Sequence, residues 1–385
     1  MPDGLLRSPL HDWHVAQGGR LVEFGGWEMP VQYPGGIVAE HVAVRERVGL
    51  FDVSHMGRLE FVGPAAAAFL DLLLTADVFA LEPGRVKYAL VCNEAGGVLD
   101  DVLVDHLQDA TGQSVYSLVV NASNRVKIVD WLGAHLAEFP QKDRLSWVDR
   151  TAETAMIALQ GPQALGLLQP LCDVPLERMK YYWITPANVA DVPCIVSRTG
   201  YTGEDGFELR IPVSAAPALV ARLMEVGATY GISPAGLGCR DTLRLEAAMP
   251  LYGHELTETI DPVAAGLSRS IAWSKKIFIG REALLGVKER GPSHTRVGLE
   301  LVGRRIPRQG FAVAAEANWL GEPIGEITSG TFSPTLQKTI AMAYVAPELA
   351  TPGRTLFVDV RGTAEPATVV PLPFYKRPKP AVVTS

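Results

Sequence analysis

The sequence predicts an α+β fold made of two related units and a C-terminal β-rich unit. The evidence for related units is a strand-like segment that leads through Gly-Pro into a helix, at residues 59–74 and again at 156–171. After about residue 275 the sequence pattern changes to short strand-like segments separated by glycine and proline turns. A chain of 385 residues has room for two or three such domains.

Each related unit is expected to place helices over an antiparallel sheet. In the first unit we predict strands at 59–62, 87–91, 98–103 and 115–120, and helices at 63–74 and 123–139. In the second unit we predict strands at 156–159, 194–197 and 207–211, and helices at 161–171 and 213–226. Outside the strand-Gly-Pro-helix pattern the two units share few residues.

The C-terminal region has the regular spacing of a small β-barrel or a sandwich, and the pattern alone does not separate these two. The strands that we expect there cover residues 297–301, 311–314, 323–327, 340–345 and 355–360.

Composition argues against several classes of function. The net charge is −7 and no basic block stands out, which argues against a nucleic-acid partner. No apolar run approaches ~20 residues, so we expect no membrane span. The N-terminus lacks an apolar signal core, and Asp3 argues against a transit peptide. A cytoplasmic location follows, or the mitochondrial matrix if the chain is eukaryotic and already processed.

Cysteine and histidine spacings give no sign of a metal site. The cysteines are far apart and form no Cys-x-x-Cys pair, at positions Cys92, Cys172, Cys194 and Cys239. His11, His14 and His41 match neither zinc-finger nor zincin spacing. We therefore expect free thiols in a reducing compartment and no bound metal.

Residues 197–209 form the most informative segment of the chain. Its sequence, Ser-Arg-Thr-Gly-Tyr-Thr-Gly-Glu-Asp-Gly-Phe-Glu-Leu, combines glycines that allow a close backbone approach with several carboxylates. A carboxylate such as Glu208 can accept two parallel N–H bonds from a pterin-like edge. By itself the segment favours a β-hairpin with an acidic turn over a ligand site.

Residues 234–255 are expected to begin as a helix and to stop at Pro250. Arg240 and Arg244 are four residues apart and share one face of that helix, beside Leu243 and Ala247. Apolar and small neighbours indicate burial, and buried arginines need anionic partners.

Asp100 and Asp101 follow a Gly-Gly turn and precede a strand. Successive side chains of a strand point to opposite faces, so at most one of these carboxylates faces a given site. The alternation does not choose between them, because both faces carry apolar residues.

These segments together resemble the aminomethyltransferase family, the T-proteins of the glycine cleavage system. Further matching motifs follow in the family's order along nearly the whole chain, at residues 24–30, 48–57, 96–102, 325–334 and 373–377. Each motif alone is weak, but their number and order make the resemblance specific.

The resemblance implies three domains around a central folate cavity. The implied division is an N-terminal segment at 1–55 that packs with the middle unit, α+β units at 56–140 and 141–274, and a C-terminal β-barrel domain at 275–385.

The resemblance also implies a reaction of glycine catabolism and one-carbon metabolism. The methylene of an aminomethyl group on the lipoyl arm of H-protein moves to tetrahydrofolate, and ammonia is released. H-protein would be a transient partner, and the P- and L-proteins indirect ones. The chemistry needs one fixed carboxylate near the developing positive charge and no metal.

The family motifs assign roles residue by residue. The catalytic aspartate maps onto Asp101. The folate-binding residues map onto, or near, Met56, Tyr88, Asn121, Tyr201, Glu208, Arg240, Trp273 and Tyr375. The alignment is loose around Trp273 and Tyr375, and Met56 also fits a flexible core position. His55 invites a catalytic role, but a lone histidine is more often structural.

Two other functions remain open. One is a folate-dependent demethylase of a small N- or S-methyl compound, which would share the fold and the folate site. The other is a non-catalytic folate-binding protein of iron–sulfur assembly. That class has a Lys-Gly-Cys-Tyr-x-Gly-Gln-Glu signature, and the comparable place here, at residues 198–205, has no cysteine.

Overall fold

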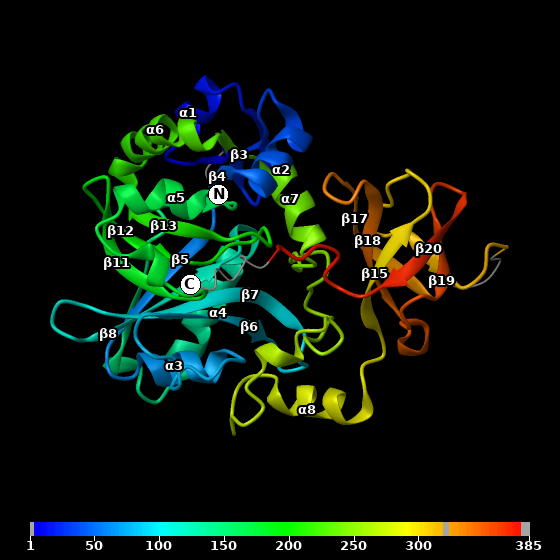
Figure 1. Cartoon of the computed structure of the whole chain (residues 1–385). Helices are drawn as coiled ribbons and strands as arrows, with labels where there is room; N and C mark the ends of the chain where they lie inside the picture. Colours follow the sequence, from blue (N-terminus) through cyan, green and yellow to red (C-terminus); the bar gives the residue numbers. More distant parts are fainter. Residues whose placement is uncertain (1–3, 319–322, 379–385) are drawn as a thin grey trace, which may run out of the picture.

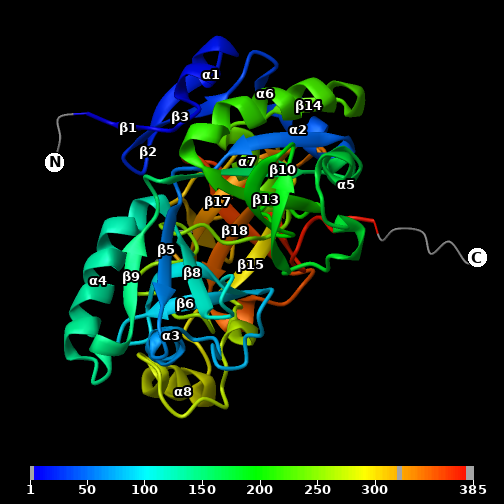
Figure 2. The same ribbon diagram turned by 90° about the vertical axis from the view of Figure 1, so that its left-hand side faces the viewer.

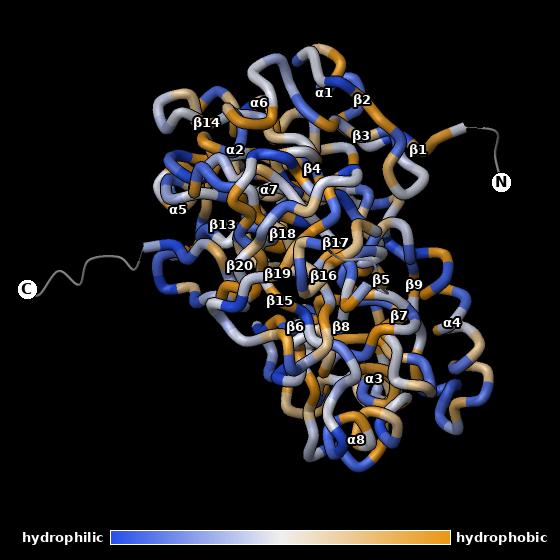
Figure 3. Tube along the Cα trace, turned by 90° about the vertical axis from the view of Figure 1, so that its right-hand side faces the viewer, coloured by the Kyte–Doolittle hydropathy of each residue, from blue (hydrophilic) through white to orange (hydrophobic). Residues whose placement is uncertain are grey.

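The computed structural model describes residues 4–318 and 323–378. Figure 1 shows two sheets with their helices on one side of the molecule and a barrel on the other. Each of these three parts has a hydrophobic core of its own. Apolar residues are frequent along the strands in Figure 3, as expected for sheets that are buried on one or both faces.

The first unit is a five-stranded sheet covered by two helices. Its sheet order is β6 (Arg85–Cys92), β7 (Val98–Gln108), β8 (Ser114–Val120), β5 (Gly57–Val62) and β9 (Ser146–Asp149). The helices are α3 (Ala66–Leu73) and α4 (Arg125–Glu138). Phe69 of α3 and Ile128 of α4 share one core with Leu59, so both helices cover the same face of the sheet.

The second unit repeats this arrangement. Its six-stranded sheet runs β11 (Ile184–Val189), β12 (Val192–Ser197), β13 (Gly206–Pro212), β10 (Thr154–Gln160), β4 (Val48–Asp52) and β14 (Ile232–Pro234). The helices α5 (Ala164–Leu168) and α6 (Ala216–Gly227) share one core with it. In both units the first strand and its helix precede a three-stranded meander, as the predicted duplication requires.

The N-terminal segment joins the second unit. It contains β1 (Leu6–Arg7), α1 (His11–Ala16), β2 (Arg20–Phe24), β3 (Trp27–Gln32) and α2 (Gly36–Glu46). Strand β4 then pairs with β10 inside the second sheet. Helices α2 and α7 (Leu237–Glu246) pack on the sheet face opposite α5 and α6, through a core that includes Val44, Phe51 and Leu243. Figure 2 shows this segment above the second sheet.

The C-terminal unit is a closed barrel, which settles the choice between a barrel and a sandwich. Its strand order is β15 (Thr295–Leu301), β18 (Lys338–Val345), β17 (Gly325–Ser333), β16 (Ala312–Ala314), β19 (Thr355–Asp359) and β20 (Ala364–Val370). Strand β17 runs on well past its predicted end at residue 327, because pairing with β18 continues beyond a bulge at Ile327 and Ser329.

At two of the expected domain boundaries, an element beyond the boundary packs with the first unit. Strand β9 lies after residue 140 but pairs with β5 of the first sheet. Helix α8 (Arg281–Arg290) lies after residue 275 but buries Leu284 against Leu90 and Val98 of the first unit. Short surface strands and a helix with little apolar content give weak signals in sequence, and tertiary packing decides where they belong.

Candidate functional site

A cavity of about 710 Å³ lies where the two sheets, helix α7 and the barrel meet. The free face of the first sheet contributes Leu103 and Val119, and the facing surface of the second contributes Met156. Phe24, Ser123 and Gly253 line the cavity and are exposed, so the cavity opens to the surface beside them. Its size is in the range of small-molecule sites.

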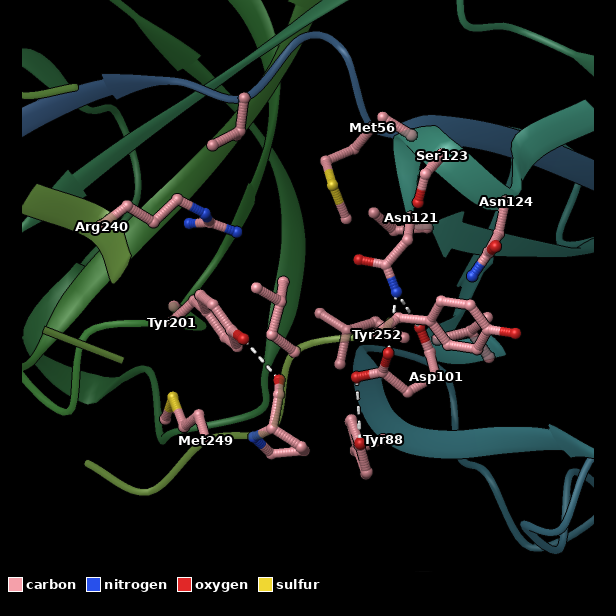
Figure 4. A pocket seen from close by; sticks show the side chains of 18 of the residues that line it. Met56, Tyr88, Asp101, Asn121, Ser123, Asn124, Tyr201, Arg240, Met249 and Tyr252 are labelled. Atoms are coloured by element: carbon pink, nitrogen blue, oxygen red, sulfur yellow. Dashed lines mark hydrogen bonds between the residues drawn. The ribbon is translucent and has the colours of Figure 1, made fainter. Parts of the chain in front are cut away.

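Seven of the nine residues predicted from sequence line this cavity. They are Met56, Tyr88, Asp101, Asn121, Tyr201, Glu208 and Arg240. Figure 4 shows Arg240 and Tyr201 on one side of the cavity and Asp101 on the other. The cavity is therefore polar at its two ends.

The Asp101 end is built on β7. Tyr88, on the neighbouring strand β6, donates its hydroxyl to Asp101 Oδ2 at 3.0 Å, and Asn121 Nδ2 donates to Asp101 Oδ1 at 2.8 Å. Burial raises the pKa of Asp101, and these two hydrogen bonds oppose the rise. A fixed carboxylate with raised proton affinity can both stabilise positive charge and exchange a proton.

Asp100 lies beneath this group and is fully buried. Its carboxylate accepts hydrogen bonds from Asn121 and Asn124 and does not line the cavity. The structure thus places Asp101 at the cavity and Asp100 behind it, a choice that strand alternation did not make.

Glu208, on β13, lies in the second polar region of the cavity. Its Oε2 accepts a hydrogen bond from the Thr199 hydroxyl, and the side chain is 7% exposed. Burial raises the pKa of Glu208, while the Thr199 hydroxyl and the Arg240 charge oppose this rise. The described residues donate no hydrogen bond to its other oxygen, Oε1, which stays available to a ligand.

The two arginines of α7 differ in a way that sequence did not show. The Arg244 guanidinium is buried and pairs with Glu255 at 2.8 Å and Asp241 at 2.7 Å. In residues 4–318 and 323–378, Arg240 has no ion-pair partner, and its guanidinium lies 4.6 Å from the centre of the Tyr201 ring. An unpaired guanidinium in a cavity favours an anionic ligand group.

The glycine-rich loop between β12 and β13 is both a strand connection and part of the cavity. The strands pair antiparallel, as the hairpin interpretation expects. A Cβ at Gly200 would meet Gln160 Oε1 at 1.9 Å, and one at Gly206 would meet the Leu159 carbonyl at 2.4 Å. These glycines therefore allow close packing on β10, and the neighbouring Tyr201 reaches the cavity.

Trp273 and Tyr375, the two residues of the looser alignment, are not among the residues that line the cavity, and their assignment to the folate site stays a prediction. Trp273 packs with the core beside α8 and donates its indole N–H to the Ser268 carbonyl at 3.0 Å. Tyr375 donates its hydroxyl to Glu204 at 2.7 Å and stacks on Arg45. Tyr375 therefore ties the C-terminal segment to α2 and the glycine-rich loop.

Several lining residues were missed from sequence. They are mostly single residues from separate elements, including Phe24, Tyr182, Tyr252, His254 and Arg296. No local pattern marks them, since they meet only when the barrel and the long segment after α7 close the cavity. The motif at residues 48–57 contains His55, which also lines the cavity.

His55 is buried and uncharged. Burial and the nearby Arg240 charge lower its pKa to about 3, so the imidazole stays neutral at physiological pH. Its Nδ1 has no hydrogen-bond partner among the described residues, and its ring meets Phe24 edge-on. Nothing in this geometry makes His55 an acid or a base.

A buried polar network holds the loop that carries His55 and Met56. Asp52 Oδ2 pairs with His14 Nε2 at 2.9 Å and accepts the Ser8 hydroxyl, while Oδ1 accepts the Ser54 backbone N–H at 2.8 Å. Despite burial, these partners lower the pKa of Asp52 to about 2. The network ties the N-terminal segment to the cavity wall.

Within residues 4–318 and 323–378, no group of three or more His, Cys, Asp or Glu side chains could hold a metal ion. No helix in the same ranges is long and apolar enough to cross a membrane.

Fold and cavity define a multidomain α+β protein with a cavity of small-molecule size, lined by a buried carboxylate and a guanidinium. Two family models match the chain: the GCVT N-terminal domain over residues 10–275 and the glycine cleavage T-protein C-terminal barrel domain over residues 294–376.

Full-length relatives agree with these matches. Aminomethyltransferases of Desulfitobacterium hafniense and Streptomyces coelicolor are 46% and 47% identical to the chain, each over 97% of it and 99% of the relative. The crystal structure of glycine cleavage system aminomethyltransferase T from Bartonella henselae superimposes with a TM-score of 0.88 at 33% identity. That match covers 97% of this chain and 99% of the other.

The chain belongs to the glycine cleavage T-protein family of aminomethyltransferases. It is accordingly a transferase, as the sequence predicted, and the relatives do not favour the demethylase or the iron–sulfur assembly alternative.

Proposed function

We propose that the cavity binds tetrahydrofolate and that Asp101 assists transfer of a methylene group to it from an aminomethyl-lipoyl arm of H-protein. The observation that carries this proposal is that Arg240, which has no ion-pair partner among the described residues, and the carboxylate of Asp101 face the cavity from opposite sides. Glu208, one oxygen of which accepts no hydrogen bond from the described residues, supplies the third polar contact.

The residues present fit the chemistry of a folate. The pterin edge donates paired N–H groups, which suits the carboxylate of Glu208, and the glutamate tail is anionic, which suits Arg240. Met56 and Tyr201 supply apolar walls for the rings. Bound in this way, tetrahydrofolate would supply the two nitrogens that accept the carbon.

In the proposed reaction, the transferred carbon loses its bonds to the lipoyl sulfur and to the amino nitrogen. Two protons leave the accepting nitrogens, and the released thiol and ammonia each gain one. Asp101 stabilises the positive charge that develops on carbon and nitrogen, and its raised proton affinity lets it pass a proton along. Tyr88 and Asn121 hold this carboxylate in place.

The donor group is proposed to arrive on the arm of another protein, since the cavity opens to the surface. Such a docking is transient, so we expect a small and partly polar interface. With a net charge of −7, the chain would recognise its carrier through local basic residues, and the encounter rate would fall with salt. Contact with the P- and L-proteins would be indirect.

The test is a reconstituted glycine cleavage reaction with aminomethylated H-protein, with and without tetrahydrofolate. We expect methylene transfer only when both are present. A parallel assay replaces H-protein with a free aminomethyl-lipoamide analogue, which should react much more slowly. Equal use of the free analogue would contradict the carrier-protein assignment and favour a small-molecule donor.

A further inference from the structure

Asp100 and Asp101 share one amide group, which makes them a single unit. Asn121 Nδ2 lies 2.8 Å from Asp100 Oδ1 and 2.8 Å from Asp101 Oδ1. An amide nitrogen has two hydrogens, so each carboxylate can take one. No Lys, Arg or His among the described residues forms an ion pair with either carboxylate, and the two negative charges therefore act on each other at short range.

The surroundings of Asp100 are those of an ionised carboxylate. It accepts three N–H groups: Nδ2 of Asn121, Nδ2 of Asn124 at 2.6 Å, and the backbone N–H of Asn121 at 3.0 Å. These groups only donate, and none could accept a proton from a neutral Asp100. Asn124 is also the N-cap of α4, where the helix dipole favours a negative charge.

The surroundings of Asp101 allow either state. It accepts from the Asn121 amide, from its own backbone N–H and from one rotatable hydroxyl, that of Tyr88. A hydroxyl can turn from donor to acceptor when its partner gains a proton. Of the two carboxyls, Asp101 is therefore the one that can take up and release a proton.

We propose that Asp100 is a positioning residue: a permanently ionised buried carboxylate that fixes Asn121 and, through its charge, makes Asp101 the proton-exchanging member of the pair. This inference rests on the proposed function for the use of that proton, but the charge arrangement can be measured without any substrate.

The geometry explains why Asn121 depends on Asp100. The pairing of β7 with β8 ends at Leu103 and Val119, so the backbone N–H of Asn121 has no partner in the sheet. The carboxylate of Asp100 takes that N–H and the side-chain amide together. Asn121 is held at two points, and its Nδ2 is aimed at Asp101.

Burial raises the pKa of both carboxyls. The charge of Asp101 also raises the pKa of Asp100, and the N–H groups of Asn121 and Asn124 oppose that rise. Because two carboxylates this close resist joint ionisation and three donors stabilise ionised Asp100, the geometry assigns the shared proton to Asp101. The other titratable or charged groups around the pair come from β6, the loops around the cavity, the segment after α7 and the barrel. They are Tyr88, Tyr182, Tyr201 and Tyr252, whose own pKa values the charge of Asp100 or Asp101 raises, and Arg296, which lines the same cavity.

The test is a titration of the free protein by ¹³C NMR with aspartate labelled at the carboxyl carbon. Asp100→Asn and Asp101→Asn assign the two signals. In the parent, Asp101 should titrate well above an ordinary aspartate, and Asp100 should stay ionised throughout that range. In Asp100→Asn, the Asp101 titration should fall by about one pH unit or more, because a like charge at short range is gone.

A control and an independent variant keep the test decisive if Asp100→Asn folds poorly. Asp105→Asn changes another buried aspartate of β7, one that pairs with Arg210, and should leave the Asp101 titration in place. Asn124→Ala removes one donor from Asp100 alone. We expect Asp100 to stay ionised and Asp101 to titrate in its parental range. A lower titration of Asp101, with the proton on Asp100 instead, would contradict the inference.

The activity profile is the second readout. Activity that needs ionised Asp101 is lost as pH falls through its pKa, so the acid limb of kcat/KM should move to lower pH in Asp100→Asn and not in Asp105→Asn. An Asp101 titration that is the same in the parent and in Asp100→Asn would overturn the inference. So would a parent in which Asp100 titrates near neutral pH while Asp101 stays ionised. Neither result would affect the assignment of folate as acceptor.

Discussion

Replacing Glu208 by Gln tests the folate site at one atom. The substitution keeps the shape of the side chain, but it removes the charge and turns one acceptor oxygen into a donor. Glu208 Oε2 is held by Thr199, and Oε1 has no donor among the described residues, so a ligand with paired N–H groups can use both oxygens.

The expected loss follows from that geometry. Hydrogen bonds to a charged group contribute about 1.5–3 kcal/mol each, and the variant loses at least one of them. The dissociation constant for tetrahydrofolate should therefore rise about tenfold or more. Titration calorimetry on the folded variant measures it directly, and a thermal melt should show little change.

Glu204 provides a matched control on the same glycine-rich loop. It is buried, but its Oε1 accepts from Arg45 at 2.9 Å and from Tyr375 at 2.7 Å, and it does not line the cavity. Glu204→Gln should lower the melting temperature and leave the folate affinity within about twofold. Unchanged affinity in Glu208→Gln, or an equal loss in Glu204→Gln, would refute the assignment of Glu208 to the ligand.

Three further outcomes follow from single contacts. Arg240→Met should weaken the binding of folates that carry a glutamate tail by about tenfold and should hardly change the binding of a tail-free pterin, as measured by calorimetry. Equal losses of affinity for both ligands would contradict a contact between Arg240 and the tail. Asp52→Asn should cost about 2 kcal/mol at pH 7, because the folded pKa of Asp52 is about 2 against ~3.9 unfolded. This stabilisation is present above pH ~4 and is lost as pH falls towards 2, so urea melts at pH 3 should show a smaller gap than at pH 6. Lys275→Met should destabilise by about 2–3 kcal/mol in urea, since its Nζ donates to the carbonyls of Leu74 at 2.8 Å and Ala76 at 2.9 Å; an unchanged midpoint would show that water replaces it.

Much of the fold could be predicted from local patterns. The strand-Gly-Pro-helix repeat marks β5 with α3 and β10 with α5, because apolar periodicity and proline at a helix start are local signals. The N-terminal strands β1 to β3 and helix α8 were not predicted. They are short or mixed in composition, and their place depends on partners far away in the chain.

The site shows the same limit at the level of residues. Motif residues such as Glu208 and Arg240 were found because they lie in dense patterns. Sequence did not reveal that Arg244 pairs with Glu255 while Arg240 has no ion-pair partner in the part of the chain that the structure describes, since Glu255 lies on an irregular segment. Trp273 does not line the cavity, and it lies in a stretch whose sequence differs from the family pattern.

The Asp100 and Asp101 pair shows why geometry is needed. Strand alternation places the two side chains on opposite faces, and nothing in sequence selects the face of the cavity. The structure selects Asp101 and adds an unexpected link through Asn121, which lies just beyond the paired part of β8.

The central claim is that Asp101 assists methylene transfer from an H-protein arm to tetrahydrofolate. The most direct measurement is the transfer rate of Asp101→Asn in the reconstituted reaction, together with its folate affinity. Removal of one electrostatic group should cost about 2–4 kcal/mol of transition-state stabilisation, so the rate should fall by about 30- to 1,000-fold while folate binding changes much less. An Asp101→Asn variant as active as the parent, with Asp100→Asn inactive instead, would contradict the account.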